Sequence, residues 1–435
     1  MRNQFTKPLA LNKWFSLPFT ANSFTLSLNT LNGLSAYRKI SNPYTLVNLQ
    51  GLNFTHGILE LAVQLNKEPV EKVYLNVTPT ALLVSCSVNT TDIYLSRYTY
   101  FALRDLIGVA EQYSFEIYYW PNFFKENGKS DYLKITKAKQ GLCISQKAGY
   151  SFLKPSTVLP KLNLAEPATL SPLWFIDEKP NVTQPYTVGF CLAYTDLKRW
   201  HTQHYPFLIP YWAKLTQNKT AIKYFNGFVG TGSTAPAFVL SQTQSLLMDI
   251  CKQMQTLALI QQHAFTANSL NIDAINRANV LKQRNLFVLY QQALPLLSRQ
   301  LFSFYYCTHG MRNVKGKPQK QLLIPCYFAS DVPVLCFILK QRGEYIELQL
   351  KFKIGTRSYT LPNNFIVGFF VAAKQMPSRF YLLRSFRDYS LVAFFVAYNF
   401  KICVLKVHWV YFEEFLKELS RLYFSNIPTV DVNTG

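Results

Sequence analysis

The chain has 435 residues, 49% of them hydrophobic and 15% aromatic, so it can build a sizeable core and is not a disordered protein. Its 17 Gly and 22 Pro residues are too few for a fibrous or low-complexity protein. The 45 Lys and Arg residues exceed the 23 Asp and Glu residues and give a formal net charge of +22. This excess favours a polyanionic partner, namely nucleic acid, an anionic membrane surface or an acidic protein, unless it serves solubility alone.

The first 115 residues mix strand and helix signals. Residues 71–90 alternate apolar and polar side chains on both sides of a turn at Pro79, which predicts a β-hairpin. Residues 98–114 place their apolar side chains near one face, which predicts a helix. Residues 1–60 carry mixed helix and loop signals.

The middle of the chain begins with β-like patterns at 115–120 and 132–135 and continues through a proline-punctuated connection. Residues 241–306 then contain no Gly and a single proline, Pro295, and their apolar residues recur every three or four positions. This spacing predicts a block of helices, with a break near Pro295.

Short apolar runs bounded by turn residues follow Pro318 and predict an antiparallel sheet. The apolar run 391–398 is also predicted as a buried strand, and the amphipathic pattern of 409–423 predicts a terminal helix. Together these patterns predict an α+β fold. We expect four parts. Residues 1–115 form a domain with a hairpin and a helix, and residues 116–240 form a β-rich segment. Residues 241–321 form the helical block, and residues 322–435 form an antiparallel sheet with a helix.

The eight cysteines are scattered singly, and no Cys-x-x-Cys pair occurs. This usage is typical of free thiols in a reducing compartment. The N-terminal residues show no secretory pattern, and the longest apolar runs, 365–373 and 391–398, are shorter than the roughly 20 residues of a membrane helix. We therefore expect a cytoplasmic protein without a membrane partner.

A search for catalytic chemistry finds no complete motif. The glycines of 227–233 are not followed by the Lys of a phosphate-binding loop. His201 and His204 are three residues apart but have no third zinc ligand nearby. No nucleophile signature or carboxylate pair is evident. We expect a protein that is not an enzyme and has no cofactor and no metal, while an enzyme of unfamiliar type centred on the two histidines remains an alternative.

Two basic clusters are candidate nucleic-acid-binding sites. The first lies in a loop with Gly and Pro residues, where cations can meet phosphates without a fixed geometry; its members are Arg312, Lys315, Lys317 and Lys320. In the second, arginines alternate with aromatic residues such as Phe380 and Tyr381; its members are Arg379, Arg384 and Arg387. This alternation suits stacking on single-stranded bases, and it equally suits one exposed face of a sheet.

The segment 84–103 resembles a SWIM zinc finger, in which a strand carries Cys-x-Cys and a Cys-x-His opens the following helix. Here Cys86 holds the first ligand position, whereas Val88, Ser96 and Tyr98 occupy the other three. The resemblance therefore implies a strand, loop and helix arrangement that has lost its zinc.

Residues 70–425 are similar in order and pattern to the accessory region that precedes the motor in bacterial Swi/Snf-type DNA translocases. No Walker-type loop and no acidic helicase box occurs in the chain, so the resemblance implies the accessory part without the motor and without nucleotide hydrolysis. We expect a non-catalytic accessory protein that binds DNA or another polyanion, beside a separate motor ATPase if the resemblance extends to partners. The alternative is a protein–protein scaffold whose basic surface meets an acidic partner.

We expect the purified, untagged protein to contain no stoichiometric zinc, because a structural zinc site needs four good ligands and only Cys86 is retained. Elemental analysis measures this directly. A zinc content equal to the protein content would show that other residues complete the site.

Overall fold

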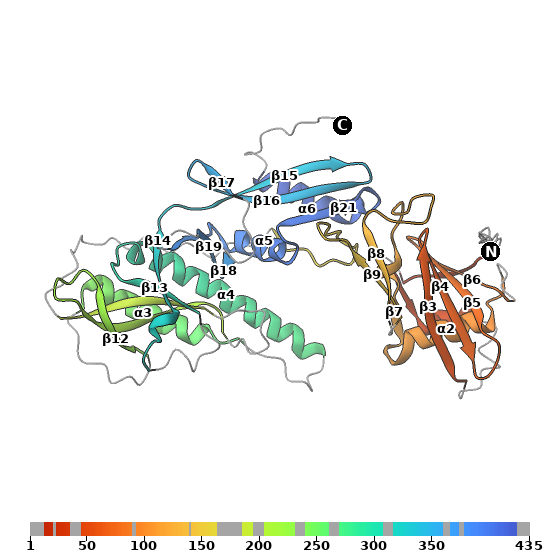
Figure 1. Ribbon diagram of the computed structural model, residues 1–435, viewed down its shortest axis with the longest axis horizontal. Coiled ribbons are helices and arrows are strands. Elements are labelled where there is room, and N and C mark those ends of the chain that lie inside the picture. The colour runs from red at the N-terminus through yellow and green to blue at the C-terminus, as the bar shows by residue number, and fades with distance from the viewer. Residues whose placement is uncertain are drawn as a thin grey trace, which may run out of the picture. The chain divides into compact units, whose positions relative to one another are not determined.

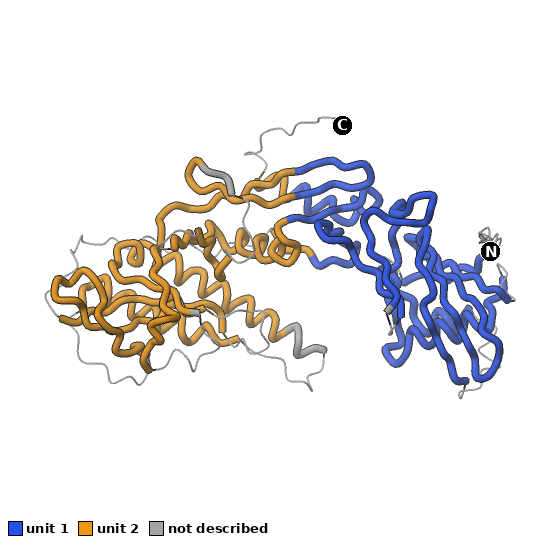
Figure 2. Tube along the Cα trace, in the orientation of Figure 1, with its two compact units in different colours: residues 1–158, 339–348, 401–417 blue, residues 159–338, 349–400, 418–435 orange. Residues whose placement is uncertain are grey.

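The computed structural model describes residues 13–20, 23–34, 45–88, 93–138, 141–162, 185–194, 204–230, 240–260, 269–307, 316–359, 366–373 and 378–423. It contains both helices and strands in quantity, so the predicted α+β class is confirmed (Figure 1). The chain divides into two compact units (Figure 2). Unit 1 comprises residues 1–158, 339–348 and 401–417, and unit 2 comprises residues 159–338, 349–400 and 418–435.

Unit 1 is built on a five-stranded antiparallel sheet in the order β1-β6-β5-β4-β3. Its strands are β1 (Phe15–Pro18), β3 (Val47–Thr55), β4 (Ile58–Leu65), β5 (Glu71–Val77) and β6 (Ala81–Cys86). Every second residue of β4 is buried, as expected for a strand with one face on a core. The predicted hairpin at 71–90 is confirmed by the pairing of β5 with β6.

Helix α2 (Arg97–Ile107) follows this hairpin and packs on the sheet. The side-chain oxygen of Ser96 accepts a hydrogen bond from the Thr99 N–H at 3.2 Å and caps the helix. The apolar pattern predicted a helix as far as Ser114, but α2 ends at Gly108, whose φ of 56° lies in the left-handed region that favours glycine.

Shorter elements complete this part of unit 1. They are β2 (Thr25–Ser27), α1 (Leu28–Leu34), a 3-10 turn (Gly108–Ala110), β7 (Gln112–Ser114), a 3-10 helix (Glu116–Tyr118), β8 (Leu133–Ala138) and β9 (Gly141–Gln146). Strand β2 pairs with β7, and β8 pairs with β9. The β-like prediction for 115–120 is wrong, because the Tyr118 and Tyr119 N–H groups bond to carbonyls three residues earlier.

Unit 2 contains an eight-stranded mixed sheet in the order β12-β11-β10-β13-β14-β20-β19-β18. Its strands are β10 (Tyr186–Tyr194), β11 (Phe207–Leu215), β12 (Ile222–Phe228), β13 (Ser303–Cys307), β14 (Leu323–Ala329), β18 (Ile366–Val367), β19 (Phe370–Ala373) and β20 (Ser378–Leu382). Strand β10 is parallel to β13, and β14 is parallel to β20. Strands from the middle and from the end of the chain thus share one sheet.

Two helices confirm most of the predicted helical block at 241–306: α3 (Gln242–Leu257) and α4 (Ser269–Leu297), which pack against each other and on the sheet. The prediction is wrong at the end of the block, where Ser303–Cys307 form strand β13. Ser241 and Gln244 form a reciprocal capping box at the start of α3. Pro295 lies within the last turn of α4. Part of the buried core of unit 2 comes from the apolar face of α3, including Leu247 and Met254.

The C-terminal part of the chain adds a four-stranded sheet in which β16 pairs with β15, β17 and β21, together with two helices. These elements are β15 (Val334–Arg342), β16 (Tyr345–Ile354), β17 (Arg357–Tyr359), α5 (Phe386–Ala397), β21 (Lys401–Leu405) and α6 (Trp409–Tyr423), with 3-10 turns at Lys320–Leu322 and Lys406–His408. The terminal helix is confirmed. In the described part of the chain, no helix is both long and apolar enough to cross a membrane.

The prediction of a strand at 391–398 is wrong, because most of this run lies in α5. Ser385 caps the helix, and Leu391, Val392 and Phe395 are buried at helical spacing. A short run that is apolar on every side does not distinguish a buried strand from a buried helix.

A cluster of buried polar side chains contacts the 3-10 helix Glu116–Tyr118 and the two residues that follow it. The Lys154 ammonium donates hydrogen bonds to the carbonyls of Glu116 and Tyr119 at 3.2 and 3.0 Å and lies 3.3 Å from the centre of the Trp120 ring. The Glu116 carboxylate accepts hydrogen bonds from the N–H and the hydroxyl of Ser156. Burial lowers the pKa of Lys154 to about 7, and the charge of Glu116 opposes this shift.

His408 is fully buried in the same cluster, with its ring centre 5.2 Å from that of Tyr119. Burial, and next the positive charge of Lys154, lower the pKa of His408 to about 4. The unfolded chain takes up a proton at this residue near pH 6.5, whereas the folded chain does so only near pH 4. The unfolded state therefore gains stability as the pH falls between these values.

We expect His408→Phe to remove this contribution. Between pH 7 and 4 the free energy of unfolding should fall less in the variant than in the wild type, by up to about 3 kcal/mol, since one pKa unit corresponds to about 1.4 kcal/mol. Urea denaturation at several pH values measures it. His56→Asn is the matched control, because His56 is exposed, and it should follow the wild type. Parallel pH profiles for His408→Phe and the wild type would contradict the assignment.

Candidate nucleic-acid interface

Most aromatic side chains of the described residues are buried or half-buried. Four exposed ones are found among the described residues, and all are tyrosines: Tyr186, Tyr224, Tyr327 and Tyr411. Exposed rings are informative in a chain that buries so many others, because they mark surfaces where a partner can be bound.

Tyr186 and Tyr224 lie on either side of one lysine in the sheet of unit 2. Tyr186 of β10 is paired with Lys214 of β11, and Lys214 is paired with Tyr224 of β12. The Lys214 nitrogen lies 5.8 Å from the centre of the Tyr186 ring and 5.9 Å from that of Tyr224. Both distances are within the range of a cation–π interaction. We call these three residues the tyrosine–lysine row.

A tryptophan extends the row on the same face. Trp212 precedes Lys214 by two residues, and its ring centre lies 5.9 Å from that of Tyr186. Its partner on β12 is Gly227, where an added Cβ would lie 3.1 Å from the indole Nε1. The glycine thus leaves room for the half-buried indole beside the strand.

The described end of the predicted basic loop lies beside β12. The Gly316 carbonyl accepts a hydrogen bond from the Phe228 N–H at 2.7 Å. Lys317 and Lys320, which follow, are exposed. Phe228 is four residues from Tyr224, a distance of about 13 Å along a strand. The other two predicted cations of this loop, Arg312 and Lys315, lie outside the described residues.

The segments around the tyrosine–lysine row carry lysines but no carboxylates of their own. Residues 185–194, 204–230 and 316–322 contain no Asp or Glu. They contain five lysines, Lys214, Lys219, Lys223, Lys317 and Lys320. In the sequence, residues 197–248 are free of Asp and Glu, and this acid-free stretch is the signal that could have directed attention to β11 and β12.

The second predicted cluster is arranged differently. Phe380 and Tyr381 are buried, so these rings are not available to stack on bases. Arg379 is exposed and is paired with the exposed Tyr327 of β14. Tracing the register through β13 and β10 places this pair on the face of the sheet opposite to Lys214.

The other two arginines of this cluster flank the start of α5. Arg384 is exposed, and Arg387 is half-buried. Burial raises the pKa of the Asp388 carboxyl, while the hydroxyl of Tyr423, which donates to it at 2.6 Å, and the charges of both arginines act in the opposite direction. The positive charges of Arg384 and Arg387 thus act partly on the buried carboxyl group of Asp388.

Two of the four residues at the SWIM-like positions, Ser96 and Tyr98, form hydrogen bonds within unit 1. Cys86 ends β6, and Val88 lies in the segment after it. Ser96 caps α2, and the Tyr98 hydroxyl donates to Glu68 at 2.9 Å.

His204 is buried, with Nδ1 2.9 Å from the Tyr205 carbonyl, and burial lowers its pKa. Its predicted neighbour His201 lies outside the described residues. Within the described ranges, no three His, Cys, Asp or Glu side chains gather as ligands for a metal ion.

Comparisons with protein-family models, with curated proteins and with solved structures give no significant match.

Proposed function

We propose that the protein is a non-catalytic binder of single-stranded nucleic acid and that the tyrosine–lysine row is its contact surface. The observation that carries this proposal is the position of Lys214 between two exposed tyrosines on strands without any carboxylate. Tyrosine rings stack on unpaired bases, and lysines neutralise the phosphates between them.

The chemistry of the row favours a single strand over a duplex. In a duplex the faces of the bases are stacked on each other, so exposed rings gain little from it. Each stacked base contributes about 1–3 kcal/mol and is accepted whatever its identity. Lysine contacts to phosphates likewise carry no sequence information. We therefore expect moderate affinity and little sequence preference.

The alternative function is a scaffold that binds an acidic protein. The same lysines would attract acidic side chains, and tyrosine and tryptophan are enriched at protein interfaces. Binding of a single strand and binding of an acidic protein differ in the role of the tyrosine rings, because stacking on bases requires both exposed tyrosines. A role beside a separate motor ATPase remains part of the proposal, and it is supported by the resemblance in sequence alone.

We expect a labelled single-stranded oligonucleotide to bind the full chain with a log–log salt slope of about −3 to −4, since each of five phosphate contacts contributes about −0.7 on a single strand. Fluorescence anisotropy at several salt concentrations measures this. Lys214→Gln should make the slope less steep by about 0.7. A duplex of the same sequence should bind more weakly at equal salt.

The double variant Tyr186→Ala, Tyr224→Ala should weaken single-strand binding by at least tenfold and leave the salt slope unchanged, because it removes stacking and keeps the charges. Tyr411→Ala is the matched control, since Tyr411 is an exposed tyrosine of unit 1, and it should change affinity less than twofold. Equal losses in both variants, or no binding at low salt, would contradict the proposal and favour the scaffold.

A further inference from the structure

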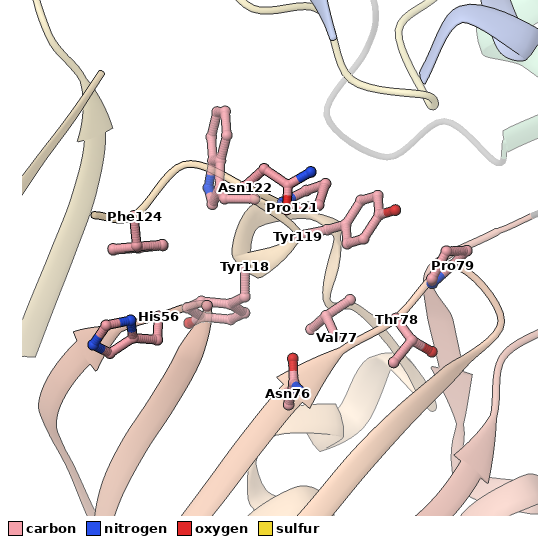
Figure 3. Close-up of a pocket in the computed structure, with 12 residues that line it drawn as sticks. His56, Asn76, Val77, Thr78, Pro79, Tyr118, Tyr119, Pro121, Asn122 and Phe124 are labelled. Atoms are coloured by element: carbon pink, nitrogen blue, oxygen red, sulfur yellow. The ribbon is translucent and has the colours of Figure 1, made fainter. Parts of the chain in front are cut away.

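Unit 1 contains a pocket of about 380 Å³ that is separate from the tyrosine–lysine row (Figure 3). It lies between the β3–β4 turn, the β5–β6 turn and the chain from Tyr118 to Phe124. Its volume falls within the range of about 300–1,000 Å³ that is usual for small-molecule sites. The site thus has the size of a small organic ligand.

The lining combines aromatic rings with neutral polar groups. Tyr118 and Phe124 are half-buried and present part of their rings to the pocket, and His56 is exposed at its edge. Asn76 and Asn122 add two side-chain amides (Figure 3). The lining contains no Lys, Arg, Asp or Glu. A ligand of this pocket therefore gains no ion pair and is expected to be uncharged.

The polar groups of the lining have unused hydrogen-bonding capacity. Among the described residues, the amides of Asn76 and Asn122 and the ring of His56 form no side-chain hydrogen bond. Each amide offers a donor and an acceptor side by side. This pattern matches the edges of nucleobases, where donors and acceptors also alternate in one plane.

Three lining residues are held in backbone conformations that most residues avoid. His56 and Gly57 form the two-residue turn between β3 and β4 with φ values of 53° and 78°. This turn favours Asn or Asp at its first position. Asn122 has a φ of 60°. Left-handed backbone at a non-glycine residue often marks a functional constraint.

Contacts within unit 1 also hold the residues that line the pocket in place. Lys154 binds the Tyr119 carbonyl and lies over the Trp120 ring, and both of these residues line the pocket. On the other side, the His56 ring lies 6.4 Å from the Phe124 ring, centre to centre. The site is thus preorganised, which lowers the entropy that a ligand loses on binding.

We propose that this pocket binds an uncharged aromatic heterocycle with hydrogen-bonding groups in its plane, of the class of a nucleobase in a nucleoside. Tyr118 and Phe124 contact the faces of the heterocycle, and Asn76 and Asn122 bind its edges. This inference does not depend on nucleic-acid binding by unit 2.

The probes are the four common ribonucleosides, titrated singly into the full chain and followed by isothermal calorimetry and ligand-observed NMR. A ligand of this size is expected to bind with a Kd of about 0.1–1 mM. Because no charge is involved, the Kd of the preferred nucleoside should be unchanged in high salt, and its 5′-monophosphate should bind no more tightly.

Asn76→Ala and Asn122→Gly should each weaken binding of the preferred nucleoside about tenfold, because each removes one amide. Glycine at position 122 keeps the left-handed backbone. Asn48→Ala is the matched control on the same sheet, since Asn48 is exposed outside the pocket. The variant Tyr186→Ala, Tyr224→Ala should also retain nucleoside binding, which separates this inference from the function proposed for unit 2.

Three results would overturn the inference. They are no signal with any nucleoside at millimolar concentration, equal binding of free ribose, and a Kd that Asn76→Ala leaves unchanged. Binding that weakens with salt and improves with the phosphate would also overturn it, because it would place the ligand on the cationic surface instead.

Discussion

The packing of aromatic rings is the interaction on which both units depend. The chain carries 34 Phe, 27 Tyr and 6 Trp residues, and a buried ring removes roughly 150–250 Å² of surface from water. In unit 1 the Phe152 ring lies within 6.2 Å, centre to centre, of five other aromatic rings. In unit 2 Phe370 has ring neighbours at 5.1, 5.6 and 6.0 Å. Since the fold buries rings so consistently, the exposed Tyr186 and Tyr224 stand out as a surface with another use.

The aromatic core also determines where the charged side chains lie. With the interior occupied by apolar and aromatic side chains, the excess of cations remains on the surface, and solvent-accessible ion pairs such as Lys72–Glu60 contribute little to stability. The ammonium group of Lys214 lies near two tyrosine rings, those of Tyr186 and Tyr224. A cation held between rings keeps most of its charge available to an external anion, which a lysine paired with a carboxylate does not.

The sequence predicted elements whose signal is local, and it missed sites that depend on register. The β5–β6 hairpin, helices α3 and α4 and the terminal helix α6 were predicted, because alternation and helical spacing are visible within one segment. The tyrosine–lysine row joins residues 186, 214 and 224, which become neighbours only through the pairing of three strands. The pocket of unit 1 likewise needs two turns and a third segment to meet. Conversely, Phe380 and Tyr381 alternate with arginines as a stacking surface would, yet their rings belong to the core.

We propose that Tyr186, Lys214 and Tyr224 form the surface that contacts an unpaired strand. Ultraviolet cross-linking of a single-stranded oligonucleotide to the full chain, followed by mass spectrometry of the digested complex, tests it most directly, because stacked bases cross-link to the rings that they touch. We expect cross-linked peptides from β10, β11 or β12 that carry the nucleotide on Tyr186, Trp212 or Tyr224. Cross-links confined to residues outside these three strands would contradict it.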